Sequence, residues 1–444
     1  MVFGLGKLFG KKEIPAESAA TPEAAPEYAP DHPVNAFVRR EAIFDKGRKL
    51  AGHLFCVQIA DAGPGDVPTE RQTRLDDTLL RALCASTEAW GQLPAFLPLS
   101  SESLANPGLD RLPANNAVLL LSLAPESVDL PNLAARLSAL AARGLRFGVF
   151  RQPRHPAFPL VLGHADLAVV DASRAQGGEI RDFSIAMRSD EMRRPVELLA
   201  IGIESPDDVR LCVQCRFGLF QGRFFAREAP ATQPRSDPNR LHLIHLYNLT
   251  QGDAETAQLA SVLKQDPNLT FRILRYLNSA AVALSRPVSS IDQALVLLGR
   301  QRLARWISVL LFSVRDPDFA DWLLVESALA RGRMMELLGA ERFPAAEADH
   351  LFLTGVFSRL DKLLRIPLPA ALEQITLPAH VRNALLERNG AYAPLLAVVE
   401  AAEASGPSAV EAMASAAGLA ADSVNHALIA ATAWANDVTS EWEA

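Results

Sequence analysis

The sequence predicts two domains of different class, an α/β domain followed by an all-helical domain. Between residues 35 and 228 short apolar runs alternate with helical patterns, as they do in successive βα units. Residues 229–239 hold three prolines and no apolar periodicity, which is typical of a linker. From residue 240 to 436 the pattern is helical almost without interruption. A chain of 444 residues is long enough to bury a core in each half.

The first domain contains about eight candidate strands, most of them short apolar runs. They are Phe37–Phe44, Lys49–Val57, Ala95–Leu99, Ala117–Leu121, Arg146–Phe150, Leu167–Asp171, Leu198–Ile203 and Gly218–Gln221. Helical patterns at Leu75–Thr87, Leu133–Arg143 and Asp207–Cys215 lie between some of these strands. The alternation predicts a mostly parallel sheet, either open or closed as a barrel. Because a (β/α)₈ barrel usually needs ~250 residues, the connections must be short or some helices absent.

The second domain shows helix boundaries that agree with its apolar periodicity. Asp266 and Pro267 are expected to begin a helix, with Asp as the N-cap and Pro in the first turn. Ser290 and Gln293 form a capping box for a helix that Gly299 ends. Leu303–Val314 is apolar nearly all round, which predicts a central buried helix. Further helices are expected at about 319–338, 347–364, 369–375, 378–388, 392–404, 407–417 and 421–436.

Residues 1–34 are expected to be a disordered segment. Residues 13–34 are rich in Ala, Pro and Glu and lack the periodicity that a core requires. The first twelve residues mix Phe and Leu with three lysines, but no apolar stretch of a secretory signal follows. Both a weak membrane-touching peptide and a frayed terminus would have this composition, so the role of this peptide stays open.

Composition and charge exclude several classes of protein. The net charge of −7 and the pI of about 5.8 lack the basic footprint of a nucleic-acid binder. Because no apolar run reaches ~18 residues, no transmembrane segment is expected. Four cysteines in so long a chain indicate a reducing compartment, the cytoplasm. Cys212 and Cys215 are interpreted as buried structural residues, and Arg300, Arg302 and Arg305 as a solvated face.

The second half resembles the HDOD family over roughly residues 236–432. The resemblance is strongest from Leu259 to Gly299. Its anchors are Asp266-Pro267, Asn278-Ser279, Pro287, Ser289-Ser290 and Leu298-Gly299. This resemblance implies the fold of metal-dependent HD phosphohydrolases without their metal ligands.

The residues of this half agree with a domain that lacks metal and cofactor. None of the nine histidines is followed by Asp, and Asp349-His350 has the reverse order. Val356-Phe357-Ser358 stands where the catalytic family would have Leu-His-Asp. His242 and His245 share one helix face and are interpreted as polar-edge residues, since no second ligand set is visible.

The first half resembles the EAL domain, the fold that hydrolyses the bacterial messenger cyclic di-GMP. The resemblance lies mainly at its two ends, Val38–Asp45 and Phe217–Phe225. Asp171, Glu204 and Gln221 fall at positions where the family has functional polar residues, and we treat them as remnant EAL-like positions of a cofactor-binding site, retained either for hydrogen bonds inside the barrel mouth or by drift.

Most residues that the EAL chemistry needs are missing. Two-cation attack on a phosphodiester requires several carboxylates, an Asn and a Lys. The positions that the resemblance assigns to them hold other residues: Leu54 for the signature glutamate, Pro98 for the Asn, Val118–Ser122 for the next carboxylate, Phe150-Arg151 for the paired aspartates and Val169 for the Lys. No catalytic residue, metal or cofactor is therefore expected.

The sequence thus predicts a reduced EAL-like (β/α) barrel at 35–228 followed by an HDOD domain at 240–436. The main hypothesis is a non-catalytic regulator in cyclic di-GMP signalling that binds a protein partner through its HDOD domain. One alternative is a cyclic di-GMP phosphodiesterase with a displaced active site, and another is a structural scaffold. The identity of the partner and the retention of cyclic di-GMP binding are left open.

Overall fold

The computed structural model of this chain describes most of both predicted domains. The described residues are 36–57, 68–85, 93–113, 116–125, 129–188, 195–222, 238–252, 254–266, 269–270, 288, 290–312, 319–404 and 407–443. Residues 1–34, most of the linker at 229–239 and the anchors Asn278, Ser279 and Pro287 lie outside them. The chain forms two compact units. The barrel unit is Pro33–Pro230 with Glu400–Ala430, and the helical unit is Ala231–Val399 with the C-terminal residues from Ala431.

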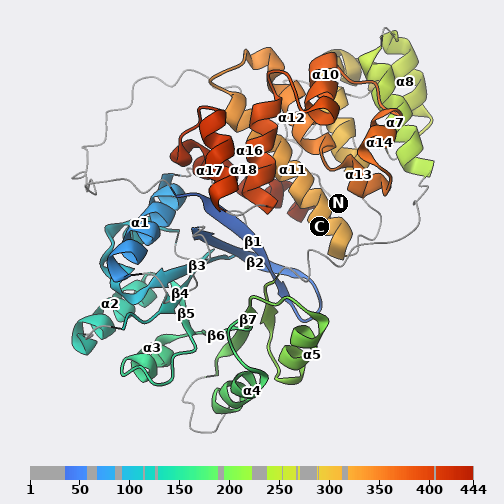
Figure 1. Cartoon of the computed structure of the whole chain (residues 1–444). Helices are drawn as coiled ribbons and strands as arrows, with labels where there is room; N and C mark the ends of the chain where they lie inside the picture. Colours follow the sequence, from blue (N-terminus) through green and yellow to red (C-terminus); the bar gives the residue numbers. More distant parts are fainter. Residues whose placement is uncertain are drawn as a thin grey trace. The chain divides into compact units, whose positions relative to one another are not determined.

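Eight strands close into a barrel in chain order (Figure 1). They are β1 (Val38–Asp45), β2 (Leu50–Val57), β3 (Ala95–Ser100), β4 (Ala117–Ser122), β5 (Arg146–Phe150), β6 (Leu167–Asp171), β7 (Glu197–Ile201) and β8 (Leu219–Phe220). β1 pairs antiparallel with both β2 and β8, and all other neighbours pair in parallel. The predicted strands are confirmed. The alternation of strands and helices allowed either an open sheet or a closed barrel, and the structure shows the barrel.

Alternate residues of each strand point into the barrel and form one apolar cluster. This interior cluster contains Ile43, Leu54, Phe96, Val118, Leu120, Phe150, Leu167, Val169, Leu199, Ile201 and Leu219. The strands covered by helices are apolar on their outer face as well, so they read as continuous apolar runs. Leu119 of β4, for example, is completely buried although it lies between two members of the cluster in sequence. The strands could therefore be recognised in the sequence as short apolar runs, although apolar and polar residues do not alternate along them.

Two connections carry no α-helix, which helps to keep the barrel small. The turn from β1 to β2 is closed by Asp45, whose Oδ1 accepts hydrogen bonds from the backbone N–H groups of Gly47 and Lys49. Two 3₁₀ turns, η2 (Ser101–Ala105) and η3 (Pro107–Arg111), join β3 to β4. The remaining connections carry helices, namely α1 (Thr69–Ala85), α2 (Leu130–Ala142), α3 (Phe158–His164), α4 (Gly177–Ala186) and α5 (Pro206–Gln214).

The helical half is built from helices that agree closely with the predicted ones. They are α7 (Pro238–Gln251), α8 (Thr256–Lys264), α10 (Ile291–Phe312), α11 (Phe319–Gly339), α12 (Ala348–Phe357), α13 (Leu360–Leu364), α14 (Leu368–Leu372), α15 (Ala379–Arg382), α16 (Ala393–Ala404), α17 (Pro407–Ala416) and α18 (Ala421–Glu443), with the short turns η5 (Ala345–Glu347) and η6 (Asn383–Glu387). Asp266 and Ser290 act as caps, accepting bonds from the N–H groups of Leu269 and Gln293. Gly299 has a φ of 75° and breaks α10 in two.

Arg305 is buried, contrary to the expectation of a solvated face. Its guanidinium pairs with Glu336 of α11 and with Asp349 of α12, the latter at 3.1 Å. The same guanidinium lies 3.9 Å from the ring centroid of Phe352. The sequence cannot distinguish such a buried cation from a surface one, because its partners lie on other helices. Breaking a buried pair of this kind is costly, since it leaves one charge without compensation.

The C-terminal segment Glu400–Ala430 packs with the barrel unit, although the sequence-based boundaries place it in the helical domain. Asn425 of α18 is completely buried. Its Oδ1 accepts a hydrogen bond from Val38 N–H at 2.7 Å, and its Nδ2 donates to the carbonyl oxygen of Ala36 at 2.9 Å. One side chain thus pairs two buried backbone groups just where β1 begins. The domain boundaries themselves remain predictions.

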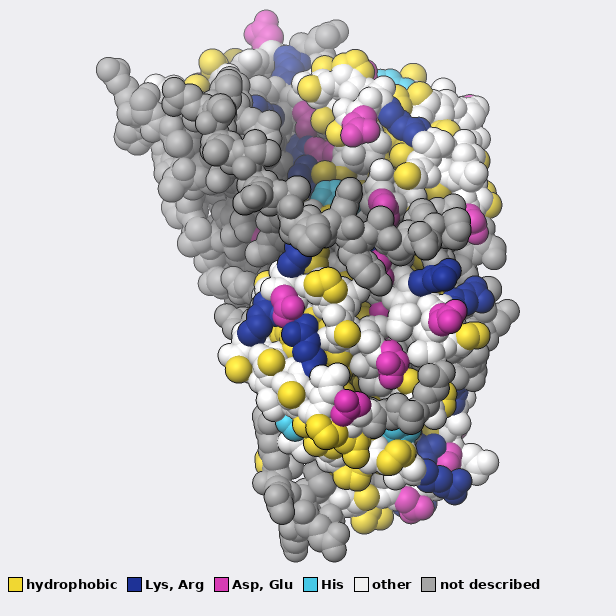
Figure 2. Space-filling model, turned by 90° about the vertical axis from the view of Figure 1, so that its left-hand side faces the viewer, with side chains coloured by type: hydrophobic (Ala, Val, Ile, Leu, Met, Phe, Trp, Pro, Cys, Tyr) yellow, Lys and Arg dark blue, Asp and Glu magenta, His cyan; other side chains and the backbone are white. Residues whose placement is uncertain are grey.

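The described surface and helices agree with the charge analysis. On the face drawn in Figure 2, basic, acidic and hydrophobic side chains are interspersed. Within the described residues, no helix is both long and apolar enough to cross a membrane.

Replacing Asn425 with Ala should destabilise the barrel unit by about 2–4 kcal/mol, because two buried backbone groups lose their partners and each such group costs about 1–3 kcal/mol. Urea unfolding of the full chain measures this change. The adjacent His426 is exposed, so His426→Ala is the matched control and should change stability by less than about 0.5 kcal/mol. Equal stability of the two variants would show that α18 does not support β1.

Candidate functional site at the mouth of the barrel

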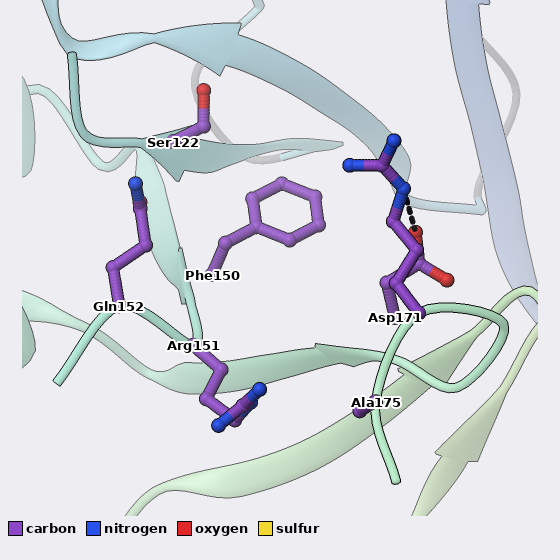
Figure 3. Close-up of a pocket in the computed structure, with 7 residues that line it drawn as sticks. Ser122, Phe150, Arg151, Gln152, Asp171 and Ala175 are labelled. Carbon is purple, nitrogen blue, oxygen red and sulfur yellow. Dashed lines mark ion pairs between the residues drawn. The ribbon is translucent and has the colours of Figure 1, made fainter. Parts of the chain in front are cut away.

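A hollow of about 160 Å³ opens where three neighbouring parallel strands end. Ser122, Phe150 and Asp171 are the last residues of β4, β5 and β6. The lining consists of these three residues with Arg151, Gln152, Arg174 and Ala175 (Figure 3). This is the carboxyl end of the barrel, the end at which barrel enzymes of this architecture carry their active sites.

The loops around the hollow are fixed by hydrogen bonds that their own residues supply. The Gln152 amide accepts from Leu123 N–H at 2.7 Å and donates to the carbonyl of Leu123 at 2.9 Å. Arg151 pairs with Glu179 of α4 at 3.0 Å. The N–H of Gln176 and then Arg151 hold the pKa of Glu179 below its usual value. These bonds order the β4 and β5 loops and leave an arginine at the edge of the hollow.

Asp171 lies in the hollow and is held by its own turn. Its Oδ1 accepts from the N–H of Ser173 at 3.0 Å and from the hydroxyl of Ser173 at 2.6 Å. Arg174 lies 4.0 Å from its other oxygen, the ion pair drawn in Figure 3. Gly202, just after β7, lies against this carboxylate: a Cβ there would be 2.6 Å from Asp171 Oδ1.

Gln221, directly after β8, connects the backbone that follows β7 to β1. Its Oε1 accepts a hydrogen bond from Gly202 N–H at 2.9 Å, and its Nε2 donates to Glu41 of β1. Glu41 also pairs with Arg39 at 2.8 Å, and both side chains are one-fifth exposed. Hydrogen bonds thus link Gly202, Gln221 and Glu41, and Asp171 lies next to Gly202; we call these four residues the mouth network.

The strand register places Glu41 directly beside Leu54. Residues opposite each other on antiparallel strands project to the same face, with Cβ atoms about 4.5–5.5 Å apart. Leu54 faces the barrel interior, so the Glu41 side chain projects from the same inner face and is displaced by one strand. Burial, and then the charge of Glu41, raise the pKa of the neighbouring Cys56 to about 12, so this thiol stays protonated.

The structure brings together two of the three predicted remnant residues. Asp171 and Gln221 belong to the mouth network, whereas Glu204 is exposed and does not belong to it. Glu41 was missed, although its alternation with the buried Ile43 in β1 could have indicated that it faces inward. The buried, structural interpretation of Cys212 and Cys215 is confirmed by their burial. Burial and the neighbouring Cys215 raise the pKa of Cys212 to about 12.

The positions that the EAL resemblance assigns to metal ligands are largely filled by the interior cluster. Leu54, Phe150 and Val169 all belong to it. In the described part of the mouth, no three histidine, thiol or carboxylate groups converge closely enough to share one ion. Glu41 and Asp171 are each engaged by neighbouring groups. The described side chains of the mouth therefore do not fit a pair of cations.

Comparison with known proteins shows what parts of this chain are similar to. The chain combines an eight-stranded closed barrel with a set of helices. Residues 241–387 match the HDOD domain family, and the chain has an HDOD domain there. The cyclic di-GMP phosphodiesterase CdgJ of Vibrio cholerae is 26% identical over 287 residues, which are 64% of this chain and 65% of CdgJ.

Two further proteins are similar to this chain, one over a shorter match and one at lower sequence identity. The uncharacterized protein YuxH of Bacillus subtilis is 28% identical over 219 residues, which are 47% of this chain and 52% of YuxH. The crystal structure of the Bacillus subtilis YkuI protein, with an EAL domain in complex with cyclic di-GMP and calcium, is 14% identical with a TM-score of 0.34, covering 55% of this chain and 73% of YkuI. The chain thus matches less than two thirds of the length of CdgJ and about half of YuxH.

One prediction from the sequence is wrong by this comparison. The absence of the EAL ligands led to the expectation that the chain is not an enzyme. CdgJ, which matches 64% of this chain, is named a phosphodiesterase, and that finding overturns the expectation. The expectation rested on the loss of the usual ligand positions, with only Asp171, Glu204 and Gln221 retained.

Replacing Gly202 with Ala should destabilise the barrel by about 1–3 kcal/mol, because its φ of 68° disfavours a side chain and the new Cβ would clash with Asp171. Thermal or urea unfolding measures the change. Gly163 in α3 has open space around its Cβ position, so Gly163→Ala should be neutral or stabilising. A Gly202→Ala variant as stable as the wild type would contradict the described contact.

Proposed function

We propose that this protein is a cyclic di-GMP phosphodiesterase whose active site is displaced within the barrel mouth. The observation that carries the proposal is the position of Glu41, which presents a carboxylate beside Leu54, the residue that replaces the signature glutamate. The name of CdgJ supports the substrate class.

The mouth has side chains suited to an anionic diester. Arg151 and Arg174 line the hollow, and a guanidinium can bind two phosphate oxygens at once. Glu41 and Asp171 are carboxylates, and a positioned carboxylate can accept the proton of an attacking water. The arginines would bind and orient the phosphodiester, while Glu41, held by Gln221 and Arg39, would act as the base.

The wild-type protein should linearise cyclic di-GMP, and Glu41→Gln should lower the rate by at least about 100-fold, since a positioned base typically contributes that much. Chromatography of the dinucleotide product, with and without Mg²⁺ or Mn²⁺, measures the rate. Glu102→Gln changes an exposed carboxylate of η2 and should leave the rate unchanged. The proposal fails if the wild type shows no turnover, or if Glu41→Gln is fully active with an unchanged circular dichroism melt.

We also propose that the HDOD domain binds a protein partner. Its α10 exposes 77% of Val296 and 51% of Leu297, and exposed large apolar side chains are typical of docking surfaces. Val296→Asp should abolish the binding of proteins that co-purify with the full chain, whereas Gln293→Asp on the same helix should retain it. Identical co-purification with both variants would exclude this surface.

A further inference from the structure

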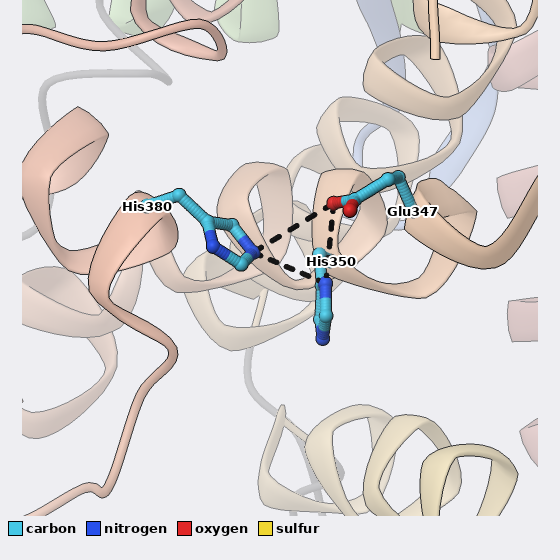
Figure 4. A group of neighbouring side chains, drawn as sticks. All are labelled: Glu347, His350 and His380. Carbon is cyan, nitrogen blue, oxygen red and sulfur yellow. Dashed lines mark hydrogen bonds and ion pairs between the residues drawn. The ribbon is translucent and has the colours of Figure 1, made fainter. Parts of the chain in front are cut away.

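Three potential metal ligands converge in the helical unit. Glu347 ends η5, His350 lies in the first turn of α12, and His380 lies in α15. Figure 4 shows the two imidazole rings and the carboxylate turned toward a common point. This group was not predicted from the sequence, because His380 is remote in sequence from Glu347 and His350. The spacing Glu-x-x-His of Glu347 and His350, which places two ligands on one helix face, was the available signal.

The separations of the ligand atoms match those around a single tetrahedral ion. His350 Nδ1 and His380 Nε2 are 3.1 Å apart, and Glu347 Oε2 lies 3.4 Å and 3.8 Å from them. Around a tetrahedral Zn²⁺ with bonds of about 2.0–2.2 Å, ligand atoms are separated by about 3.3–3.6 Å. The three atoms could therefore bind one ion with only small side-chain adjustments.

The groups around these ligands orient them as the outer shell of a metal site does. The hydroxyl of Tyr392 donates a hydrogen bond to Glu347 Oε2, and its ring packs edge-on against His380 with centroids 5.1 Å apart. Phe343 also packs edge-on against the ring of Tyr392, with ring centroids 5.2 Å apart. Asp349, adjacent to His350, is turned to Arg305. Such partners fix the direction of ligands before an ion binds.

We propose that Glu347, His350 and His380 bind one divalent transition-metal ion, Zn²⁺ in the first instance, with a fourth position open to water. Two histidines with one carboxylate form a known zinc ligand set. The ligand side chains are 23–43% exposed, so solvent reaches the site. The proposal departs from the sequence-based prediction that the chain holds no metal.

This site differs from the position where the HD family would place its metal ligands. Val356 and Phe357, which stand at that position, are completely buried and apolar. The hydroxyl of Ser358 accepts a hydrogen bond from Arg331 and donates one to the carbonyl of Gly355. The proposed ion would instead connect η5 and the start of α12 to α15.

The test uses tag-free, full-length protein treated with a chelator and then titrated with Zn²⁺ by calorimetry and with Co²⁺ by visible absorption. We expect about one ion per chain and the intense bands of a low-coordinate Co²⁺ site. His380→Gln should lower the affinity at least about 100-fold, because a ligand is lost. Tyr392→Phe should keep one site but weaken it about 10-fold. His426→Ala, at an exposed histidine, should bind as the wild type does.

Thermal melts separate loss of binding from loss of folding. Added Zn²⁺ should raise the melting temperature of the wild type and of His426→Ala, but not that of His380→Gln. Because His380 is the most exposed of the three ligands, the Gln variant should melt cooperatively without the metal. Absence of a stoichiometric site in the wild type, or undiminished binding by His380→Gln, would overturn the proposal.

Discussion

The antiparallel pairing of β1 with both β2 and β8 is the constraint on which the candidate site depends. It closes the barrel, and it sets the register that places Glu41 beside Leu54. Once the barrel is closed, its interior is filled with apolar side chains, and polar groups reach one another at the mouth. A shift of one residue in this pairing would turn both Glu41 and Ile43 from the inner face of the barrel to its outer face. The start of β1 is in turn paired by Asn425 from the far end of the chain.

The polar groups of the mouth are held in place by hydrogen bonds from neighbouring residues. Gly202 offers its N–H to Gln221, which holds Glu41, while Asp171 is fixed by its own turn. A glycine with positive φ is required where the backbone passes close to the Asp171 carboxylate. The phosphodiesterase proposal rests on this arrangement and on the relation to CdgJ. The proposed metal site is independent of both, because its ligands belong to the helical unit.

Local patterns predicted the elements of this fold well, and long-range contacts explain what they could not predict. The strands and the caps at Asp266 and Ser290 depend on neighbouring residues, so they were visible in the sequence. The inward position of Glu41 depends on strand register, and the burial of Arg305 depends on partners from two other helices. His380 joins Glu347 and His350 through the packing of α15 on α12, which no local pattern specifies.

Hydrogen–deuterium exchange of the full-length protein with and without cyclic di-GMP tests the central claim most directly. If the nucleotide binds at the mouth network, amides of β1 around Glu41 and of the turn after Asp171 should exchange more slowly in its presence. Amides of α12 and α15 should be unaffected. Protection that is confined to the helical unit, or no protection at saturating nucleotide, would contradict the account.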